Sequence, residues 1–316
     1  MSQHASHPGP TLLRAGVPVE LDRPLSELTW YRLGGPAQAL VSPRDPAELA
    51  RVVGLCAEHG WPLRVLGGGA NLLVRDAGVP GVVIRLSSPG FQSVEELEGG
   101  VLRVGAGHDL MELVQECARR GLAGLECLAG VPGTAGGAVR MNAGGVHGDI
   151  GARVAAVQCL GEDGVLREVD RRDLAFGYRH SELPGLMLTR VDLALDREDP
   201  VAVRERVKAY FAQKGRSQPM AKHSAGCCFR NPSGAEPAGR LIDLAGLKGS
   251  RLGGAEVSEV HANFIVAHGG ARADDVVALM DRVRLGVLER FGVALKREVV
   301  LWPDEGDLLA PAPVLS

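Results

Sequence analysis

Residues 130–151 read GVPGTAGGAVRMNAGGVHGDIG and are unusually rich in glycine. Ordering glycines costs more backbone entropy than ordering other residues, so we expect such a stretch where the chain packs closely against something flat and polar. Thr134 and Asn142 stand among the glycines, and the interleaved apolar residues are Val131, Val139, Met141 and Val146. These apolar side chains disfavour a flexible linker, in which they would be solvated. The stretch therefore predicts the binding site of a ring system.

A second glycine cluster, LGGGANLL at residues 66–73, follows a predicted strand. Consecutive small residues allow several backbone N–H groups to converge on a phosphate. The cluster is not a Walker loop, because no Gly-Lys-Ser or Gly-Lys-Thr follows it. The nearest approach to the Rossmann G-x-G-x-x-G is GAGHDL at 105–110, which has leucine at the third glycine position. An ordinary turn remains the alternative to phosphate binding for both loops.

Two motifs place an arginine where it could bind an anion. TWYRLGGPA at 29–37 sets Arg32 beside two glycines, where it could pair with a phosphate or be a surface charge. FGYRHSEL at 176–183 groups Tyr178, Arg179 and Ser181. A guanidinium fork with two hydroxyls can hold a carboxylate or phosphate, and a polar cluster at a strand end is the alternative.

The last apolar stretch, LKREVVLW at 295–302, carries Glu298 between apolar neighbours. If the stretch is a strand, alternation puts Glu298 on the face opposite to Arg297 and Val299. This arrangement would allow a partly buried carboxyl with a raised pKa. An exposed glutamate on an edge strand is the alternative.

The composition indicates a globular protein that acts on a small molecule. The chain has 316 residues, 45% of them apolar, and a formal net charge of −3, so no broad basic surface for nucleic acid or anionic membrane is expected. The six cysteines show no C-x-x-C pair and no Cys/His ligand spacing, which argues against a metal site and a disulfide framework. We find no signal peptide and no apolar run of roughly 20 residues, so we expect a cytoplasmic protein without membrane insertion.

The predicted elements mix helices and strands. Asp45, Pro46 and Gly60 delimit a helix over 45–60, and Asp109 and Gly121 delimit another. The remaining predicted helices cover 199–215, 237–245 and 272–291. Predicted strands surround the helices near 62–66, 81–86, 101–105, 154–169, 186–195, 255–267 and 294–302. The fold class is therefore α+β with mixed α/β character, and the two ends are expected to be disordered tails.

Six motifs occur in one order along the chain: TWYRLGGPA, GGGANLLV, PGTAGGAVRMNAG, GYRHS, SAGCCFRNP and REVVLW. In this order and spacing they resemble the UDP-N-acetylenolpyruvoylglucosamine reductases, the MurB flavoenzymes of bacterial peptidoglycan synthesis. The resemblance covers about residues 17–303. It implies the vanillyl-alcohol-oxidase-type (PCMH-type) FAD-binding fold, with two FAD-binding subdomains and a smaller α+β substrate-binding domain.

The resemblance also implies domain limits. Residues 17–85 and 86–198 would be the two FAD-binding subdomains, and 199–303 the substrate-binding domain, whose final strand returns to the FAD site. Residues 1–16 and 304–316 would be tails. The short connection between Arg179 and the 199–215 helix indicates the family type that lacks the longer substrate-capping insertion.

By the same matching, specific residues acquire roles. The implied cofactor-binding residues are Arg32, Gly67, Gly68, Gly69, Ala70, Asn71, Leu72, Pro132, Gly133, Thr134, Gly137 and Asn142. The implied catalytic residues are Arg179, Cys227 and Glu298, and the implied substrate contacts are Tyr178, Arg230 and Asn231.

The two adjacent cysteines receive different interpretations. Most relatives have serine, the proton donor, after S-A-G, and here that position is Cys227. A thiol is a stronger acid than a serine hydroxyl and can fill this role if it stays protonated. Cys228 would point the opposite way into the core if the segment is extended. Burial of both cysteines as small hydrophobic residues is the alternative.

The reaction implied is the FAD-mediated reduction of UDP-N-acetylglucosamine enolpyruvate to UDP-N-acetylmuramate, with NADPH as cosubstrate, by a monomer. Two rivals share the glycine loops: another FAD enzyme of this fold class, such as a hydroxy-acid oxidase, and a non-catalytic nucleotide-binding regulator. Neither rival explains SAGCCFRNP or the terminal R-E-V.

Overall fold

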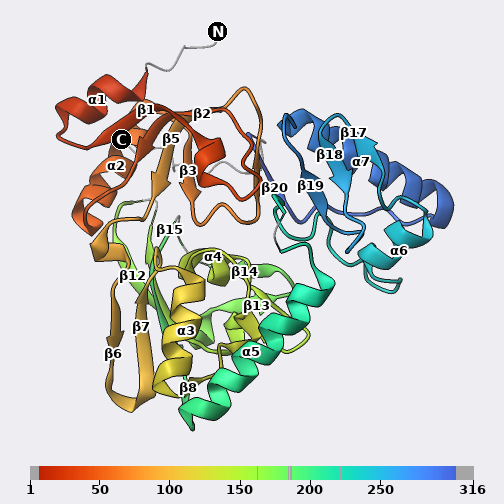
Figure 1. The fold of residues 1–316 in the computed structure, drawn as a ribbon. Helices are drawn as coiled ribbons and strands as arrows, with labels where there is room; N and C mark the ends of the chain where they lie inside the picture. The colour runs from red at the N-terminus through yellow and green to blue at the C-terminus, as the bar shows by residue number, and fades with distance from the viewer. Residues whose placement is uncertain (1–6, 162, 184, 186, 221, 304–316) are drawn as a thin grey trace.

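The structure of the chain is a computed structural model that describes residues 7–303 except 162, 184, 186 and 221. Figure 1 shows three groups of elements: two lie one above the other on the left, and the third lies to the right. Helix α5 (Pro200–Ser217) runs from the second group toward the third. Among the described residues, no helix is long and apolar enough to cross a membrane.

The first group contains a four-stranded sheet of order β1-β2-β5-β3, in which β5 pairs in parallel with both β2 and β3. Its elements are α1 (Pro8–Arg14), β1 (Val19–Pro24), β2 (Pro36–Val41), α2 (Pro46–His59), β3 (Leu63–Leu66), β4 (Leu72–Val74) and β5 (Val79–Arg85). Because β3 and β5 are parallel, their carboxyl ends meet at one edge, where the chain continues from Leu66 into the glycine cluster at 67–69.

The second group is built on a five-stranded sheet of order β12-β11-β15-β7-β6. Its strands and helices are β6 (Val94–Glu96), β7 (Val101–Gly105), α3 (Leu110–Arg120), β8 (Leu122–Ala123), α4 (Ala135–Arg140), β9 (Gly144–Gly145), β10 (Gly148–Asp149), β11 (Val154–Leu160), β12 (Leu166–Asp170), β13 (Ala175–Gly177), β14 (His180–Glu182), β15 (Met187–Ala194) and β16 (Asp196–Arg197).

The third group is a three-stranded antiparallel sheet packed with helices α6 and α7. Its elements are α6 (Ala238–Leu244), β17 (Arg251–Leu252), β18 (Ala255–Val257), β19 (Ile265–Ala267) and α7 (Ala273–Phe291). Its core includes Leu241 of α6 and Val283 of α7, and also Tyr31 and Leu73 of the first group. These shared apolar contacts hold the third group against the first.

The final strand, β20 (Val300–Trp302), leaves the third group and pairs in parallel with β4 of the first group. It is shorter than the predicted 294–302 strand, because Arg297 instead makes an isolated bridge with Phe229. Between these two pairings, the Glu298 N–H donates to the Cys228 carbonyl at 2.8 Å. The chain thereby brings Glu298 beside the cysteine pair.

The predicted starts and stops of α2 and α3 are confirmed, whereas α5 continues to Ser217, two residues beyond the predicted end at Gly215. The Asp45 carboxylate accepts from the Glu48 N–H at the start of α2, and Gly60 ends the helix with φ 65°. Asp109 accepts from the N–H groups of Met111 and Glu112 at the start of α3. These positions need only local hydrogen bonds, so the local sequence specifies them.

The prediction of a tail over 1–16 is wrong for residues 8–14, which form α1. Leu12 in this helix is fully buried and belongs to the large core shared by the first two groups. A short helix of this kind is stabilised by packing rather than by its own propensity. The predicted tail at 304–316, like residues 1–6, lies outside the described residues.

Candidate active site

The two glycine clusters lie against each other. A Cβ added to Gly68 would come within 2.5 Å of the Gly133 Cα, and one on Gly69 would lie 2.2 Å from the Leu28 carbonyl oxygen. Gly69 also has a φ of 65°, in the left-handed region. Only glycine allows this approach of the two backbones. The structure therefore brings Gly67, Gly68 and Gly69 together with Gly133, and the resemblance assigns all four to the cofactor site.

The first cluster has backbone N–H groups without acceptors among the described residues, and one of its members, Gly68, lines a pocket. Across the described part of the chain, no acceptor hydrogen-bonds to the N–H groups of residues 67–71. Successive unpaired N–H groups around a left-handed glycine form a concave site for an anion. This site fits the diphosphate of FAD, which would be held by the loop backbone with Gly68 and Gly69 at its centre.

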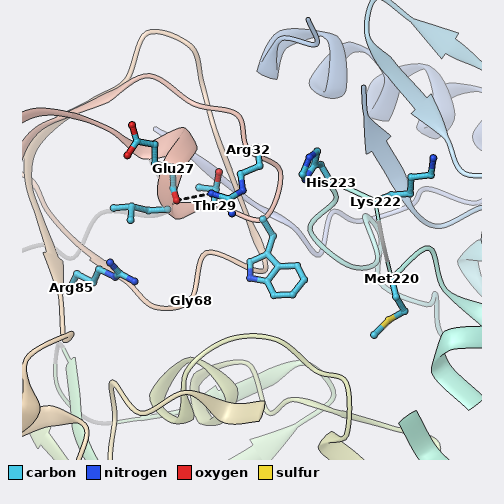
Figure 2. Close-up of a pocket in the computed structure, with 10 residues that line it drawn as sticks. Glu27, Thr29, Arg32, Gly68, Arg85, Met220, Lys222 and His223 are labelled. Atoms are coloured by element: carbon cyan, nitrogen blue, oxygen red, sulfur yellow. Dashed lines mark hydrogen bonds between the residues drawn. The ribbon is translucent and has the colours of Figure 1, made fainter. Parts of the chain in front are cut away.

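The first cluster opens onto a pocket of about 400 Å³ (Figure 2). Gly68 and Arg32 both line it, together with residues of the third group that include Lys222 and His223. Arg32 is exposed, has a φ of 55°, and donates from Nη1 to the Glu27 carbonyl at 3.0 Å. The predicted phosphate partner thus stands at the wall of the pocket that contains the glycine loop.

The second cluster contains helix α4, which the sequence analysis does not predict. Thr134 caps this helix, since its Oγ1 accepts from the Gly137 N–H at 3.2 Å. The buried Asn142 accepts from the Gly151 N–H at 3.0 Å and donates to the Gly177 carbonyl at 2.9 Å. The side chains of Thr134 and Asn142 therefore hold the loop in shape.

The other predicted cofactor residues lie around the first cluster. Asn71 donates from Nδ2 to the Glu298 carbonyl at 3.2 Å and accepts from the Val300 N–H at 3.1 Å. Leu72 begins strand β4 opposite Val300. Ala70 and Pro132 are half-buried neighbours of the two glycine clusters. The loop that fits FAD is in this way tied directly to the backbone of the predicted catalytic glutamate.

Arg179 and Glu298 form an ion pair. Nε of Arg179 lies 3.0 Å from Oε1 of Glu298, and its Nη2 donates to the Gly144 carbonyl at 3.0 Å. The side chains are 25% and 11% exposed, so both charges are largely shielded from water. Arg179 also has a φ of 54°, a left-handed conformation that is uncommon for residues other than glycine and that clusters at functional sites.

Glu298 is partly buried, with 11% of its side chain exposed, and so it is not the exposed edge glutamate that the sequence pattern alone favours. Burial raises the pKa of its carboxyl, and the nearby Arg179 and Arg230 guanidinium groups oppose this rise. The Nε of Arg230 is buried and has no hydrogen-bond partner among the described residues. A buried guanidinium N–H without an acceptor is costly unless a ligand supplies one.

The adjacent cysteines face different surroundings. Cys228 is fully buried in the third-group core, with its Sγ 3.8 Å from the Tyr31 hydroxyl, whereas Cys227 is partly exposed. Burial raises the pKa of the Cys227 thiol to about 12, and the neighbouring Glu298 carboxyl adds to this rise. Cys227 therefore remains a neutral thiol at physiological pH. All six cysteines are free thiols.

Two family models match the chain. The FAD binding domain matches residues 37–170, and the UDP-N-acetylenolpyruvoylglucosamine reductase C-terminal domain matches residues 218–302. The UDP-N-acetylenolpyruvoylglucosamine reductase of Myxococcus xanthus is 45% identical over 287 residues, which cover 90% of this chain and 92% of the relative. The chain belongs to the UDP-N-acetylenolpyruvoylglucosamine reductase family. The corresponding enzyme of Desulfosudis oleivorans is 42% identical over 295 residues, covering 90% and 94% of the two chains.

A solved structure of this reductase family supports the fold. The UDP-N-acetylenolpyruvylglucosamine reductase from Thermus caldophilus is 43% identical, has a TM-score of 0.79, and covers 91% of this chain and 100% of its own. The prediction of the FAD-binding fold with mixed helices and sheets is confirmed, as is the assignment to the oxidoreductases. Within the described residues, no group of three or more His, Cys, Asp or Glu side chains could hold a metal ion.

Two predicted substrate contacts have partners of their own. Tyr178 is exposed, and the Arg179 guanidinium carbon lies 5.3 Å from the centroid of its ring. The Asn231 Oδ1 accepts from the Ala238 N–H at 3.0 Å and so fixes the start of α6.

Two residues that shape the site, Asn263 and Lys214, are not predicted from the sequence. Asn263 is buried, and its side chain accepts from the Phe229 N–H at 3.0 Å and donates to the Phe229 carbonyl at 2.8 Å. Lys214 of α5 donates from Nζ to the Ala129 carbonyl at 2.7 Å and so fixes the entry to the second glycine cluster. Neither residue lies in a recognisable motif, and each acts through partners far away in the sequence.

Proposed function

We propose that the chain reduces UDP-N-acetylglucosamine enolpyruvate to UDP-N-acetylmuramate in peptidoglycan precursor synthesis, as a cytoplasmic monomer. FAD, when bound, would supply hydride transfer, with NADPH as the source of the electrons. Family membership and the two glycine clusters support this proposal. The division into FAD-binding subdomains at 17–85 and 86–198 and a substrate-binding domain at 199–303 belongs to the same proposal.

The observation that carries the proposal is the shielded ion pair of Arg179 and Glu298 next to Cys227. Addition of a hydride to the terminal carbon of the enolpyruvyl double bond leaves negative charge toward the substrate carboxylate. The guanidinium of Arg179 can stabilise this charge because it is already held in place by Glu298 and the Gly144 carbonyl. Burial raises the pKa of the Glu298 carboxyl against the opposing effect of Arg179, and in its protonated form Glu298 would act as a second donor.

Cys227 is proposed to complete the reduction. Its thiol proton adds to the carbon next to the one that receives the hydride, so that H⁻ and H⁺ together saturate the double bond. The raised pKa keeps this proton on sulfur until the adjacent carbon becomes basic. The thiolate left behind is then reprotonated from solvent.

The remaining substrate contacts are proposed on chemical grounds. Arg230 has a buried Nε without an acceptor in the described part of the chain, and a substrate carboxylate or phosphate oxygen would supply one. Tyr178 offers an exposed ring and hydroxyl beside Arg179. Asn231 can donate from its amide nitrogen while its oxygen accepts from α6.

The proposal is tested by following NADPH oxidation by the purified yellow protein, with and without UDP-N-acetylglucosamine enolpyruvate. We expect flavin reduction in the wild type, Cys227→Ala and Cys228→Ala, with substrate turnover collapsing only in Cys227→Ala. Normal turnover by Cys227→Ala would remove its role as proton donor. Absence of substrate-dependent turnover in the wild type would overturn the proposed function.

A further inference from the structure

Arg85 ends strand β5 at the same sheet edge from which the first glycine cluster departs. In the parallel register of β3 and β5, Arg85 lies opposite Leu66, the residue before Gly67. Both Arg85 and Gly68 line the 400 Å³ pocket, and Figure 2 shows the Arg85 side chain extending toward the segment that contains Gly68. The guanidinium therefore lies on the side of the loop that is open to a ligand.

The Arg85 guanidinium is half-buried and makes no hydrogen bond or ion pair with any described residue. Glu27, the acidic residue that lines the pocket, is already paired with Arg23 at 2.7 Å. The other arginine of the pocket, Arg32, donates to a backbone carbonyl. The positive charge of Arg85 is thus not neutralised within the pocket.

Two kinds of donor converge at this place. Among the described residues, the N–H groups of residues 67–71 lack acceptors and the adjacent Arg85 lacks an anionic partner. A nest of backbone N–H groups next to a planar guanidinium fork suits an anion that carries two charges and several acceptor oxygens. A diphosphate has this chemistry, whereas a single carboxylate would leave most of these donors unused.

We propose that Arg85 binds the diphosphate of FAD together with the glycine loop, as a cofactor-binding residue outside the family motifs. The inference rests on the proposed binding of FAD in the first glycine cluster. It assigns to Arg85 the charged contact and to the loop the neutral N–H contacts.

The test compares Arg85→Gln and Arg85→Lys with Arg282→Gln, which removes the same charge from an exposed position on α7 that has no partner among the described residues. Full-length protein is stripped of flavin and titrated with FAD and, separately, with riboflavin, which lacks phosphate; binding is read from flavin fluorescence. We expect Arg85→Gln to weaken FAD binding about tenfold to a hundredfold, as for the loss of a charge-assisted contact, and to leave riboflavin binding unchanged. Arg85→Lys should recover part of the affinity, because it restores the charge without the fork.

The melting temperature distinguishes a role of Arg85 in the stability of the fold from its proposed role in FAD binding. Without flavin, Arg85→Gln should melt at the same temperature as the wild type, since Arg85 has no partner to lose in the described part of the chain. With FAD, the variant should melt at a lower temperature than the wild type. Equal FAD affinity in Arg85→Gln and Arg282→Gln would overturn the inference, as would an equal loss of FAD and riboflavin binding. If the wild type binds FAD and turns over substrate but Arg85→Gln does so equally well, this inference fails while the proposed function stands. If the wild type itself binds no FAD, the proposed function fails first.

Discussion

The Arg179 guanidinium joins two loops by donating from Nε to Glu298 and from Nη2 to Gly144, each at 3.0 Å. Arg179 and Glu298 are 119 positions apart, and β20 must return from the third group to bring them together. The pair is therefore a product of the whole fold. Removing one partner would leave the other charge shielded from water and unpaired.

We predict that Arg179→Gln lowers kcat for substrate reduction about a hundredfold to a thousandfold, the range seen when one preorganised donor to developing charge is removed. Flavin reduction by NADPH should persist, because the glycine clusters are unchanged. Arg179→Lys should recover only part of the rate, since a lysine cannot reach Glu298 and Gly144 with a planar fork. Stopped-flow absorbance separates the two half-reactions. An equal loss of rate in flavin reduction and in substrate reduction would show that Arg179 supports the fold or cofactor binding and does not act in substrate reduction.

Glycine at position 68 is predicted to be essential for flavin binding. In Gly68→Ala the new Cβ would lie 2.5 Å from the Gly133 Cα, so one of the two loops must move. We expect the purified variant to contain little flavin and to unfold at a lower temperature. The absorbance spectrum measures the flavin content, and thermal unfolding measures the unfolding temperature.

Gly54→Ala is the matched control for this substitution. Gly54 lies inside α2, and a Cβ there meets nothing within 4 Å. Alanine should therefore raise the free energy of unfolding by about 0.5–1 kcal/mol and leave the flavin content unchanged. A Gly68→Ala protein with full flavin content would contradict the close packing of the two loops.

The parts of the fold that could be predicted from the sequence are those with local causes. Asp45 and Gly60 delimit α2 by hydrogen bonds within one turn, and the same holds for Asp109 at the start of α3. Helix α1 was missed because Leu12 is held by a core assembled from distant segments. Helix α4 was missed because glycines mask its short helical turn, whose cap is Thr134.

The candidate site likewise contains some features that the sequence motifs predict and others that depend on the folded structure. Motif matching placed Arg179, Cys227 and Glu298 together, and the structure provides the 3.0 Å contact of the first and last. It could not reveal that the Asn142 side chain is bound to the loop backbone, since this depends on Gly151 and Gly177. Nor could it point to Arg85, because the relevant neighbour, Gly68, is close only through the parallel pairing of β3 and β5.

The thiol of Cys227 is predicted to be slow to alkylate. With its pKa at about 12, the thiolate fraction at pH 8 is far below that of an ordinary cysteine, whose pKa is about 8.5. We expect modification by iodoacetamide at pH 8 to be at least about a hundredfold slower than for free cysteine. Mass spectrometry of the peptide that contains residues 227 and 228 reads the rate, and Cys227→Ser identifies the site. Labelling as rapid as that of free cysteine would show that the thiol is ionised and is no reservoir for a proton.

Lys214 gives the protein a pH-dependent stability. Burial lowers the pKa of its amine from 10.5 to about 8, and Arg179 contributes to the same direction. Between these values the folded amine is neutral while the unfolded one is still protonated, so unfolding takes up a proton and the free energy of unfolding rises with pH. This difference in pKa between the folded and unfolded states corresponds to at most about 3 kcal/mol in the free energy of unfolding. Solvent screening of the partly exposed Lys214 amine reduces this contribution.

The measurement is urea unfolding from pH 7 to 10.5 of the wild type, Lys214→Gln and Lys208→Gln. Lys208 is an exposed residue of the same helix, paired with Glu205, and serves as the control. Buried thiols such as Cys56, whose pKa is raised to about 12, lower the stability of all three proteins above pH 9 and cancel in the comparison. Relative to Lys214→Gln, the wild type should therefore gain stability as the pH rises above 8, and Lys208→Gln should follow the wild type. A constant difference between the wild type and Lys214→Gln would mean that the amine titrates normally, and that a charged lysine makes the bond to the Ala129 carbonyl at every pH below its ordinary pKa of about 10.4.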